Sequence, residues 1–423
     1  MQELFWVSAL FIAYVYLGYG VLLVLWARVA RGRSARLTNA AADLQVRDVA
    51  GSELPSVSII IAARNEADRL PARIDNLLAL DYPAERRQII IVSDGSSDDT
   101  ASALARFGDR VRLVDIPPAG KAVALNAGAT CAHGDILVFA DARQTFAPDA
   151  LRRLVAPFAD PGVGGVSGEL ILGAETDAGR RRRPRRRREV EEESLDYERR
   201  VNDRRLASTV CDGVGFYWKY EKLLRRLETE VGSMLGATGA IYALRRSLWR
   251  SLPPGTILDD VLAPMRAVLA GHRIVFEPAA RAFDYMSPDA GAESRRKVRT
   301  LAGNVQILWF EPRLLVPILN PVWLQYASHK IGRLLVPYAL MALFASSLAL
   351  SGTSMLYTFA LFAQVAFYLH GGYGAWLEHR MAVAPGDRSL VQRTGAVAFT
   401  IVVMNVSAVA GAGAALLGRK VWR

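Results

Sequence analysis

The sequence predicts an α/β domain with a mostly parallel sheet, flanked at both ends of the chain by transmembrane helices. Two short β-branched runs, Val57–Ala62 and Ile89–Val92, are typical of fully buried parallel strands. Between them, apolar residues recur at helical spacing and indicate a crossover helix: Leu70, Ile74, Leu77 and Leu78. Apolar residues make up 52% of the chain, which is high for a soluble enzyme and favours membrane segments.

Composition sets broad limits. A length of 423 residues allows two or three domains. Two cysteines, Cys131 and Cys211, fit neither a disulfide framework nor a cysteine-rich metal site, and both are expected to be buried small apolar residues. The net charge is +11, but Arg180–Arg183 and Arg185–Arg188 supply eight of these charges, which leaves 11 − 8 = +3 elsewhere. The basicity is therefore mostly local and says little about the partner of the whole protein.

The first 27 residues are expected to form a membrane anchor. The apolar run Leu4–Trp26 is long enough to span a bilayer, and it lacks the basic start and the cleavage site of a signal peptide. Four arginines follow and place the downstream side in the cytoplasm: Arg28, Arg31, Arg33 and Arg36. Residues 28–54 are expected to be a linker.

The first β-α-β unit predicts a ligand site. Arg64, Glu66 and Asp94 fall just past the carboxyl ends of its strands, where open α/β sheets bind ligands. The first turn, Ala63–Glu66, lacks Gly-x-Gly-x-x-Gly, which argues against a dinucleotide-binding domain. The alternation continues with helices near Asp98–Phe107 and Lys121–Cys131, and with strands at Val111–Ile116, Ile136–Ala140 and Val163–Leu172.

This pattern resembles the nucleotide-sugar-binding domain of glycosyltransferase family 2. The resemblance implies a GT-A-type domain over residues 55–304. It implies that the first turn, with Ala63, Arg64 and Glu66, and Asp94 hold the nucleoside of a UDP-sugar. Gly120-Lys121 resembles a segment whose lysine faces the donor phosphates. Taken alone, Ser96–Asp99 is explained well enough as a solvated turn that caps a helix, but such a turn explains the whole ordered set of residues less well.

Asp141-Ala142-Arg143 stands where the family carries Asp-x-Asp, the motif that holds a divalent ion on the diphosphate. The resemblance implies that Asp141 ligates Mg²⁺ or Mn²⁺, since Mg²⁺ takes one or two carboxylates plus phosphate oxygens. Arg143 replaces the second carboxylate, and its guanidinium could contact the diphosphate directly. An aspartate that caps a turn is the plainer interpretation of this motif alone.

A second candidate centre is Asp259-Asp260, which resembles the family's Glu-Asp motif with Asp260 at the general-base position. Attack by a sugar hydroxyl needs a carboxylate within hydrogen-bond reach to take the proton. Alone, Asp-Asp before an apolar helix is an ordinary N-cap. The small residues of Gly236–Tyr242, with Gly239, match the family segment that lines the acceptor site.

The run Arg295–Thr300 occupies the place of the family's Gln-x-x-Arg-Trp motif. Arg296 takes the glutamine position and Arg299 the arginine position, and both are expected to face acceptor or phosphate. Thr300 replaces the tryptophan, so the aromatic platform for an acceptor sugar is absent and processivity stays open. A basic helix face at a membrane surface is the alternative.

The remaining segments are flanking or inserted. Residues 173–205 form a charged insertion, expected to be a solvated loop or a contact for anionic lipids; without interleaved aromatics it does not favour nucleic acid. Residues 305–333 are expected to be interfacial. Residues 334–423 hold three apolar runs, Leu334–Leu350, Met355–Trp376 and Thr394–Leu417, and the charged Glu378–Arg393 is expected to be cytoplasmic. Three crossings would place the basic tail outside, so either one run does not cross or the tail departs from the positive-inside trend.

The resemblance thus implies a multi-pass protein of the cell membrane, expected in a bacterial inner membrane, with its catalytic domain in the cytoplasm. It would be an inverting hexosyltransferase that forms a β-linked polysaccharide or oligosaccharide from a UDP-sugar, in the layout of cellulose, chitin, hyaluronan and poly-N-acetylglucosamine synthases. About four spans are few for a pore, so a secreted polymer would need a homo-oligomer or an export partner. Single transfer to a lipid-linked acceptor is an alternative. An inactive sugar-nucleotide-binding component is another, and the intact Asp260 argues against it.

Overall fold

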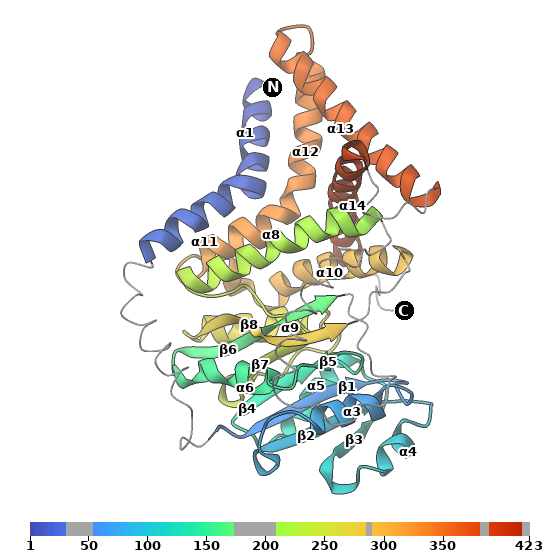
Figure 1. Cartoon of the computed structure of the whole chain (residues 1–423). Helices are drawn as coiled ribbons and strands as arrows, with labels where there is room; N and C mark the ends of the chain where they lie inside the picture. The colour runs from blue at the N-terminus through green and yellow to red at the C-terminus, as the bar shows by residue number, and fades with distance from the viewer. Residues whose placement is uncertain (31–53, 173–208, 285–289, 381–388, 417–423) are drawn as a thin grey trace.

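The computed structural model describes residues 1–30, 54–172, 209–284, 290–380 and 389–416. Several expectations lie outside these residues: most of the linker, Arg31, Arg33 and Arg36, the insertion 173–205, most of the loop before residue 390, the basic tail, and the side chains of Cys211 and Arg296. Cys131, expected to be buried, is half-buried. Figure 1 shows a sheet domain at one end of the molecule and long helices at the other, with α8 (Thr209–Val231) and α10 (Ala290–Phe310) lying across the junction.

One eight-stranded sheet has the order β3-β2-β1-β4-β7-β6-β8-β5. Neighbours from β3 to β4 are parallel, as is the pair β6–β8, whereas β7 is antiparallel to both its neighbours and β5 is antiparallel to β8. The strands expected near β1 to β4 and at β6 are confirmed. The bounds are β1 Val57–Ala63, β2 Arg87–Asp94, β3 Arg112–Ile116, β4 Ile136–Ala140, β5 Thr145–Phe146, β6 Val163–Leu172, β7 Ile241–Arg245 and β8 Arg273–Asp284.

The register brings the candidate residues to one edge. Ala63 lies opposite Ser93, so β1 and β2 end together, and Ile61 lies opposite Ala140 at the end of β4. Asp94 is the last residue of β2, and Asp141 follows β4 directly. The parallel half of the sheet therefore gathers the segments after three strands at its carboxyl edge.

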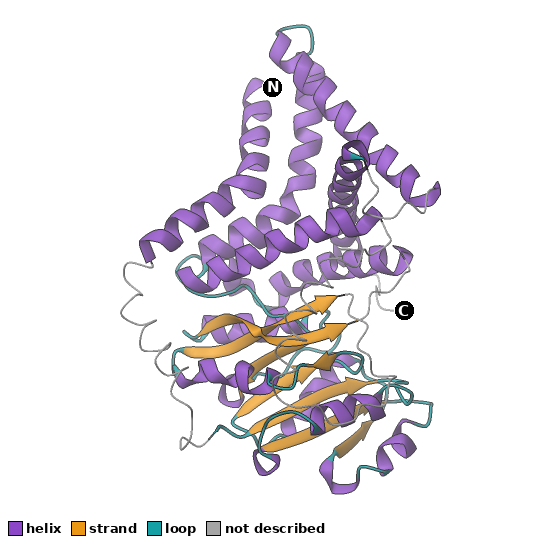
Figure 2. Cartoon of the chain, in the orientation of Figure 1, coloured by secondary structure: helices purple, strands orange, loops and turns teal. Residues whose placement is uncertain are grey.

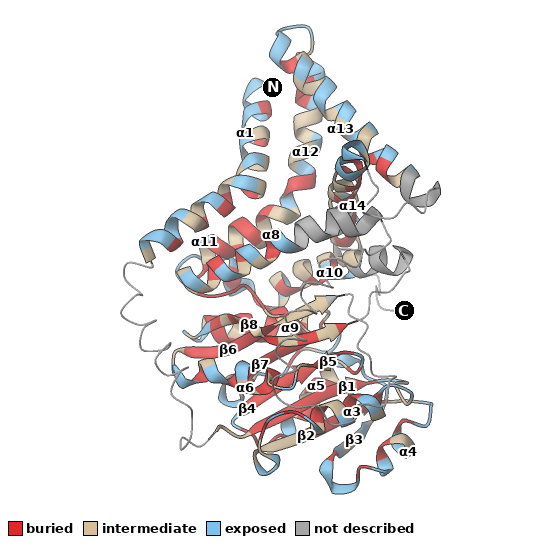
Figure 3. Ribbon diagram, in the orientation of Figure 1, coloured by how far each residue is buried: buried red, intermediate tan, exposed pale blue. Residues whose placement is uncertain are grey.

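Helices cover both faces of the sheet and bury its β-branched strands (Figures 2 and 3). Alternation along β1 sends Ile59 and Ile61 to the face that packs against α3, and Ile60 to the face that packs against α5. A Cβ on Gly128 of α5 would overlap the Ile60 side chain, so this glycine permits the close approach of helix and sheet. The short elements of the domain are α3 Leu70–Leu78, η2 Ala84–Arg86, α4 Thr100–Ala105, η3 Gly108–Arg110, α5 Lys121–Thr130, α6 Ala150–Val155, η4 Ala156–Ala159, η5 Arg246–Leu248 and α9 Asp259–Leu269.

Within the described residues, three helices are long and apolar enough to cross a membrane: Gln2–Ala30, Trp323–Leu350 and Leu390–Ala415. The fourth expected run lies in α13, which does not meet this measure because Gln364, His370 and nearby glycines dilute its apolar residues. The segment 305–333, expected to be interfacial, contains the end of α10, η6 and the start of the second candidate span, in which helix begins at Trp323; its interfacial location stays a prediction. The elements are α1 Gln2–Ala13, η1 Tyr14–Gly18, η6 Pro312–Leu315, α11 Trp323–Gln325, η7 Tyr326–Ile331, α12 Gly332–Leu350, α13 Met355–Arg380 and α14 Leu390–Leu416.

Candidate functional site

The turn after β1 is fastened to the turn after β2. Asn65 has a φ of +55°, a left-handed conformation that asparagine tolerates better than most residues. Its Oδ1 accepts a hydrogen bond from the Ser97 backbone N–H at 2.8 Å, and its own N–H donates to Ser96 Oγ at 3.1 Å. The adjacent Arg64 is exposed, and Glu66 forms an ion pair with Arg69 at 2.8 Å. The two turns are thus joined by hydrogen bonds, and they carry exposed charged side chains.

Asp94 holds the loop that starts α5. Its buried carboxylate accepts hydrogen bonds from the backbone N–H of Ala119 at 2.6 Å and of Gly120 at 3.0 Å. Gly120 has a φ of +91°, which glycine adopts without strain, and α5 begins at the next residue, Lys121. Asp94 therefore fixes the position of Lys121, a link between sequence-distant residues that no local pattern reveals.

Lys121 lies between two of the candidate carboxylates. Its Nζ is 3.2 Å from Asp141 Oδ1 and 3.3 Å from Asp259 Oδ1. Burial lowers the pKa of Lys121, but the charges of Asp259, Asp141 and Asp260 outweigh burial and raise the pKa above its ordinary value. The start of α5, the end of β4 and the start of α9 thus converge around a protonated amine.

Asp259 and Asp260 occupy different environments. Asp259 is 4% exposed, and its Oδ2 accepts a hydrogen bond from the Tyr242 hydroxyl at 3.3 Å. Asp260 Oδ2 accepts a hydrogen bond from the Gly239 backbone N–H at 3.0 Å. Burial, followed by the charge of Asp259, raises the pKa of Asp260 to about 6, with Lys121 acting in the opposite direction. Such a carboxylate is mostly ionised at neutral pH and is basic enough to take a proton from a hydroxyl that is reacting.

Gly239 makes this arrangement sterically feasible. A Cβ at position 239 would lie 3.0 Å from Asp260 Oδ2, so any side chain would crowd the carboxylate. The backbone N–H of Ala237 donates to the Asp260 carbonyl at 2.7 Å, which fixes the same loop to the start of α9. The loop 236–240 and Asp260 therefore form one unit.

Arg143 contacts a carboxylate that the sequence analysis did not identify. Its Nη2 lies 2.9 Å from Oδ2 of Asp284, the last residue of β8, and Gln144 Nε2 donates to the same oxygen at 3.0 Å. Asp284 is 4% exposed. Its position at the end of a strand could have marked Asp284 as a candidate site residue. Only the sheet order, in which β8 pairs with β5, shows that it lies beside the segment that follows β4.

Within the part of the chain that the structure describes, no group of three or more histidine, cysteine, aspartate or glutamate side chains could hold a metal ion. Of the two aspartate side chains paired with Lys121, that of Asp141 is 37% exposed, whereas that of Asp259 is 6% exposed. Because Mg²⁺ and Mn²⁺ can bind one carboxylate together with phosphate oxygens, the residues fit a metal held jointly with a ligand, not a closed protein cage.

Helix α10 supports the loop before Asp259. Gln306 Oε1 accepts a hydrogen bond from the Ile257 backbone N–H at 3.0 Å, and its Nε2 donates to the Gly255 carbonyl at 3.0 Å. Arg299 lies on an exposed part of the same helix. Gln306 was not among the expected site residues, since nothing in its local sequence marks it.

Comparison with known proteins agrees with this architecture. Residues 58–227 match the model of the family described as glycosyl transferase family 2. The poly-β-1,6-N-acetyl-D-glucosamine synthase of Staphylococcus aureus strain MSSA476 is 25% identical over 272 residues, covering 62% of this chain and 57% of the relative. The probable glycosyltransferase YdaM of Bacillus subtilis is 26% identical over 270 residues, covering 60% of this chain and 57% of the relative. The match thus spans somewhat more than half the length of these curated relatives.

Among solved structures, the mannosyltransferase PcManGT from Pyrobaculum calidifontis, in complex with GDP-Man and Mn²⁺, has a TM-score of 0.60 and 19% sequence identity. The alignment covers 95% of this chain and 99% of that chain, so the fold is shared over nearly the whole length. The expected GT-A fold and the family resemblance are confirmed. This chain thus matches the glycosyl transferase family 2 model over residues 58–227 and resembles the poly-β-1,6-N-acetyl-D-glucosamine synthases.

Proposed function

We propose that this protein is a membrane-bound inverting glycosyltransferase that transfers a sugar from a UDP-linked donor to a hydroxyl of a glycan. One observation carries the proposal. The carboxylate of Asp260 is held by the Gly239 N–H and has a pKa near 6, and it stands beside the cluster formed by Lys121, Asp141 and Asp259. A base and a fixed cation at the carboxyl edge of the sheet suit displacement of a nucleotide from a sugar.

In the proposed reaction, Asp260 takes the proton of the acceptor hydroxyl while the hydroxyl oxygen attacks the anomeric carbon. The bond between that carbon and the donor phosphate breaks, and its electron pair leaves with the nucleoside diphosphate. A single displacement from the face opposite the leaving group inverts the configuration, so an α-linked donor yields a β-glycoside. Asp259 keeps Lys121 in place through their ion pair.

The diphosphate is proposed to lie beside Lys121 and Asp141. The ammonium of Lys121 would neutralise charge that develops on the leaving group. Mg²⁺ or Mn²⁺, when held by Asp141 and phosphate oxygens, supplies further charge neutralisation there. Arg143 would contribute to the same region from its ion pair with Asp284.

The nucleoside is proposed to lie along the joined turns after β1 and β2, against Ala63, Arg64, Glu66 and Asp94. The acceptor is proposed to approach the loop containing Gly239 from the side of α10, the helix that bears Arg296 and Arg299.

The three apolar helices support a location in a membrane. Gly411, near the end of α14, packs against Val298–Ala302 of α10, so α14 ends on the side of the sheet domain. If α14 crosses the bilayer, its C-terminal end then lies on the same side as the sheet domain. The sequence continues from that end with Arg419, Lys420 and Arg423, which the positive-inside trend favours in the cytoplasm. We propose that this side is the cytoplasm.

The name of the Staphylococcus aureus relatives specifies a β-linked N-acetylglucosamine polymer, so UDP-N-acetylglucosamine is the first donor to test. We propose a β-linked glycan as the product, with a homo-oligomer or an export partner if the polymer is secreted. Single transfer to a lipid-linked acceptor is the alternative, and the size of the product distinguishes the two.

The test is UDP release by detergent-purified protein over a panel of UDP-sugars, each with and without Mg²⁺ or Mn²⁺, compared with Asp260→Asn. We expect release with one donor, dependent on metal and lost in the variant. The asparagine keeps an acceptor for the Gly239 N–H, so we expect the fold to be preserved. Equal release by both proteins would refute the assignment of the base. Donor binding without turnover, even with lipid and oligosaccharide acceptors present, would refute the enzyme and favour a sugar-nucleotide-binding component.

A further inference from the structure

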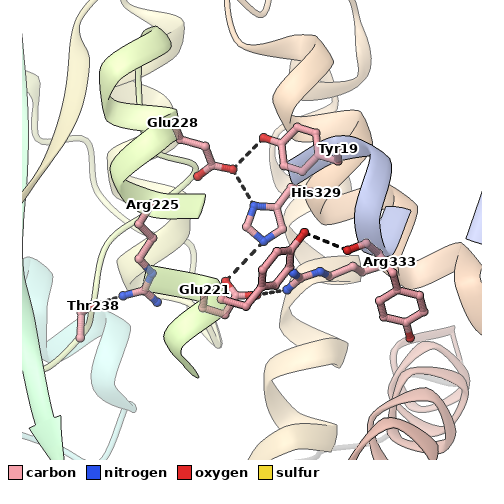
Figure 4. A network of polar contacts seen from close by, with 9 residues as sticks. Tyr19, Glu221, Arg225, Glu228, Thr238, His329 and Arg333 are labelled. Atoms are coloured by element: carbon pink, nitrogen blue, oxygen red, sulfur yellow. Dashed lines mark hydrogen bonds and ion pairs between the residues drawn. The ribbon is translucent and has the colours of Figure 1, made fainter. Parts of the chain in front are cut away.

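A network of buried polar side chains joins α8 to the membrane helices (Figure 4). His329 lies between two glutamates of α8: its Nδ1 is 2.6 Å from Glu228 Oε1, and its Nε2 is 3.4 Å from Glu221 Oε2. The hydroxyl of Tyr19 donates a hydrogen bond to Glu228 Oε1 at 2.8 Å, and Arg333 forms an ion pair with Glu221. The network therefore connects the first candidate span, α8 and the second candidate span.

The burial of this network has a physical consequence. Glu228 is 1% exposed and His329 is 5% exposed. Charged groups lose their hydration when buried, so such pairs add little net stability, yet they tolerate few alternative arrangements because an unpaired partner is costly. The network therefore favours one position of α8 relative to the two candidate spans Gln2–Ala30 and Trp323–Leu350.

Helix α8 also contacts the loop 236–240. Arg225 lies one turn from Glu221, and its Nη1 donates a hydrogen bond to Thr238 Oγ1 at 2.7 Å. Figure 4 shows this contact on the opposite side of α8 from Tyr19. The Thr238 backbone N–H donates in turn to Ser167 Oγ of β6 at 3.0 Å. Thr238 is therefore held from both α8 and the sheet.

Thr238 immediately precedes Gly239, whose N–H donates to Asp260 Oδ2. A displacement of Thr238 moves that N–H, because adjacent residues share a planar peptide unit. A series of contacts thus links Tyr19 to Asp260. Tyr19 contacts Glu228 of α8, Arg225 of the same helix contacts Thr238, and the adjacent Gly239 contacts Asp260.

We propose that Arg225 and Glu228 are positioning residues: by seating α8 on the membrane helices, they fix the loop 236–240 and, through Gly239, the carboxylate of Asp260. This inference rests on the proposed function, in which Asp260 is the base. A network that served only to hold the helices together would affect the amount of folded protein and not the geometry of the loop.

The chain offers a matched pair of tyrosines for the test. Tyr19→Phe removes one hydroxyl from the network, whereas Tyr14→Phe removes a hydroxyl on the same helix that contacts Ser328 Oγ at 2.7 Å and not α8. At the other end, Arg225→Met and Thr238→Val break the same hydrogen bond from its two sides. If one of these two variants does not fold, the other still tests the loss of this hydrogen bond.

The first readout is hydrogen–deuterium exchange of peptides covering residues 234–244, which needs no enzymatic activity. We expect faster exchange in Arg225→Met, Thr238→Val and Tyr19→Phe, and wild-type exchange in Tyr14→Phe. Unchanged exchange in the first three variants, or equal acceleration in Tyr14→Phe, would overturn the proposal.

The second readout is the division of the kinetic effect between kcat and KM. We expect kcat to fall about tenfold in Arg225→Met and Thr238→Val while the donor KM stays within about twofold, because a misplaced base slows the chemical step without weakening donor binding. A loss of activity that follows only the fraction of folded protein, with kcat per folded molecule unchanged, would overturn the proposal. If Asp260→Asn retains activity, the base assignment fails, and the exchange experiment still decides whether α8 controls the loop.

Discussion

The raised pKa of Asp260 predicts how activity depends on pH. With a pKa of about 6, the proposed base is about 90% ionised at pH 7 and about 10% ionised at pH 5, so kcat/KM should fall about tenfold over this range. The sign follows from the role: a base acts only when deprotonated, so activity is lost as the pH falls through the pKa. A carboxyl group at the ordinary value of 3.8 would stay more than about 90% ionised, and the rate would hardly change.

The environment of Asp260 gives a way to test the cause of the shift. Asp259→Asn removes the like charge that, after burial, contributes most to raising the pKa of Asp260. We expect the acid limb of the profile to move to lower pH, but not to the ordinary value, because burial remains. Asp109→Asn, on an exposed turn of the same domain, is the matched control and should leave the limb in place.

The assay is UDP release at donor concentrations well below KM, from pH 4.5 to 8, in buffers of constant ionic strength. Intrinsic fluorescence at each pH shows whether the protein remains folded. A flat profile between pH 5 and 7, or the same acid limb in wild type and Asp259→Asn, would refute this account of Asp260 as a base tuned by burial and its neighbour.

Three further predictions concern charge and packing. Lys121→Met should lower kcat by about 100-fold or more in the UDP-release assay, because two carboxylates lose their cation and the leaving group loses its counter-charge; a rate within a few fold of wild type would contradict this. Arg143→Ala should lower the free energy of unfolding by about 2 kcal/mol in chemical denaturation, since the buried Asp284 loses its ion pair while Arg143 itself is partly solvated; unchanged stability would contradict this. Gly374→Ala should lower the detergent Tm, because its Cβ would overlap a carbonyl oxygen of α14, whereas Gly372→Ala, with open space around the added Cβ, should not.

The sequence alone determined the framework of the domain. Local periodicity shows which residues of an element are buried. The β-branched runs predicted the buried strands β1 and β2, and the helical spacing of apolar residues predicted the buried face of α3. The candidate residues Asp94 and Asp141 follow directly from this framework, because the carboxyl ends of neighbouring parallel strands meet at one edge. The apolar runs at both ends of the chain likewise depend only on length and composition.

Only the tertiary structure decided which charges meet. Lys121 pairs with Asp141 at the end of the next strand, and also with Asp259, which is more than a hundred positions away in the sequence. Arg143 and Asp284 are likewise more than a hundred positions apart. The contact of His329 with Glu228 is of the same kind. Local periodicity carries no information about such contacts, because they depend on the order in which β7, β6 and β8 add to the parallel half of the sheet and on the position of α8 above it.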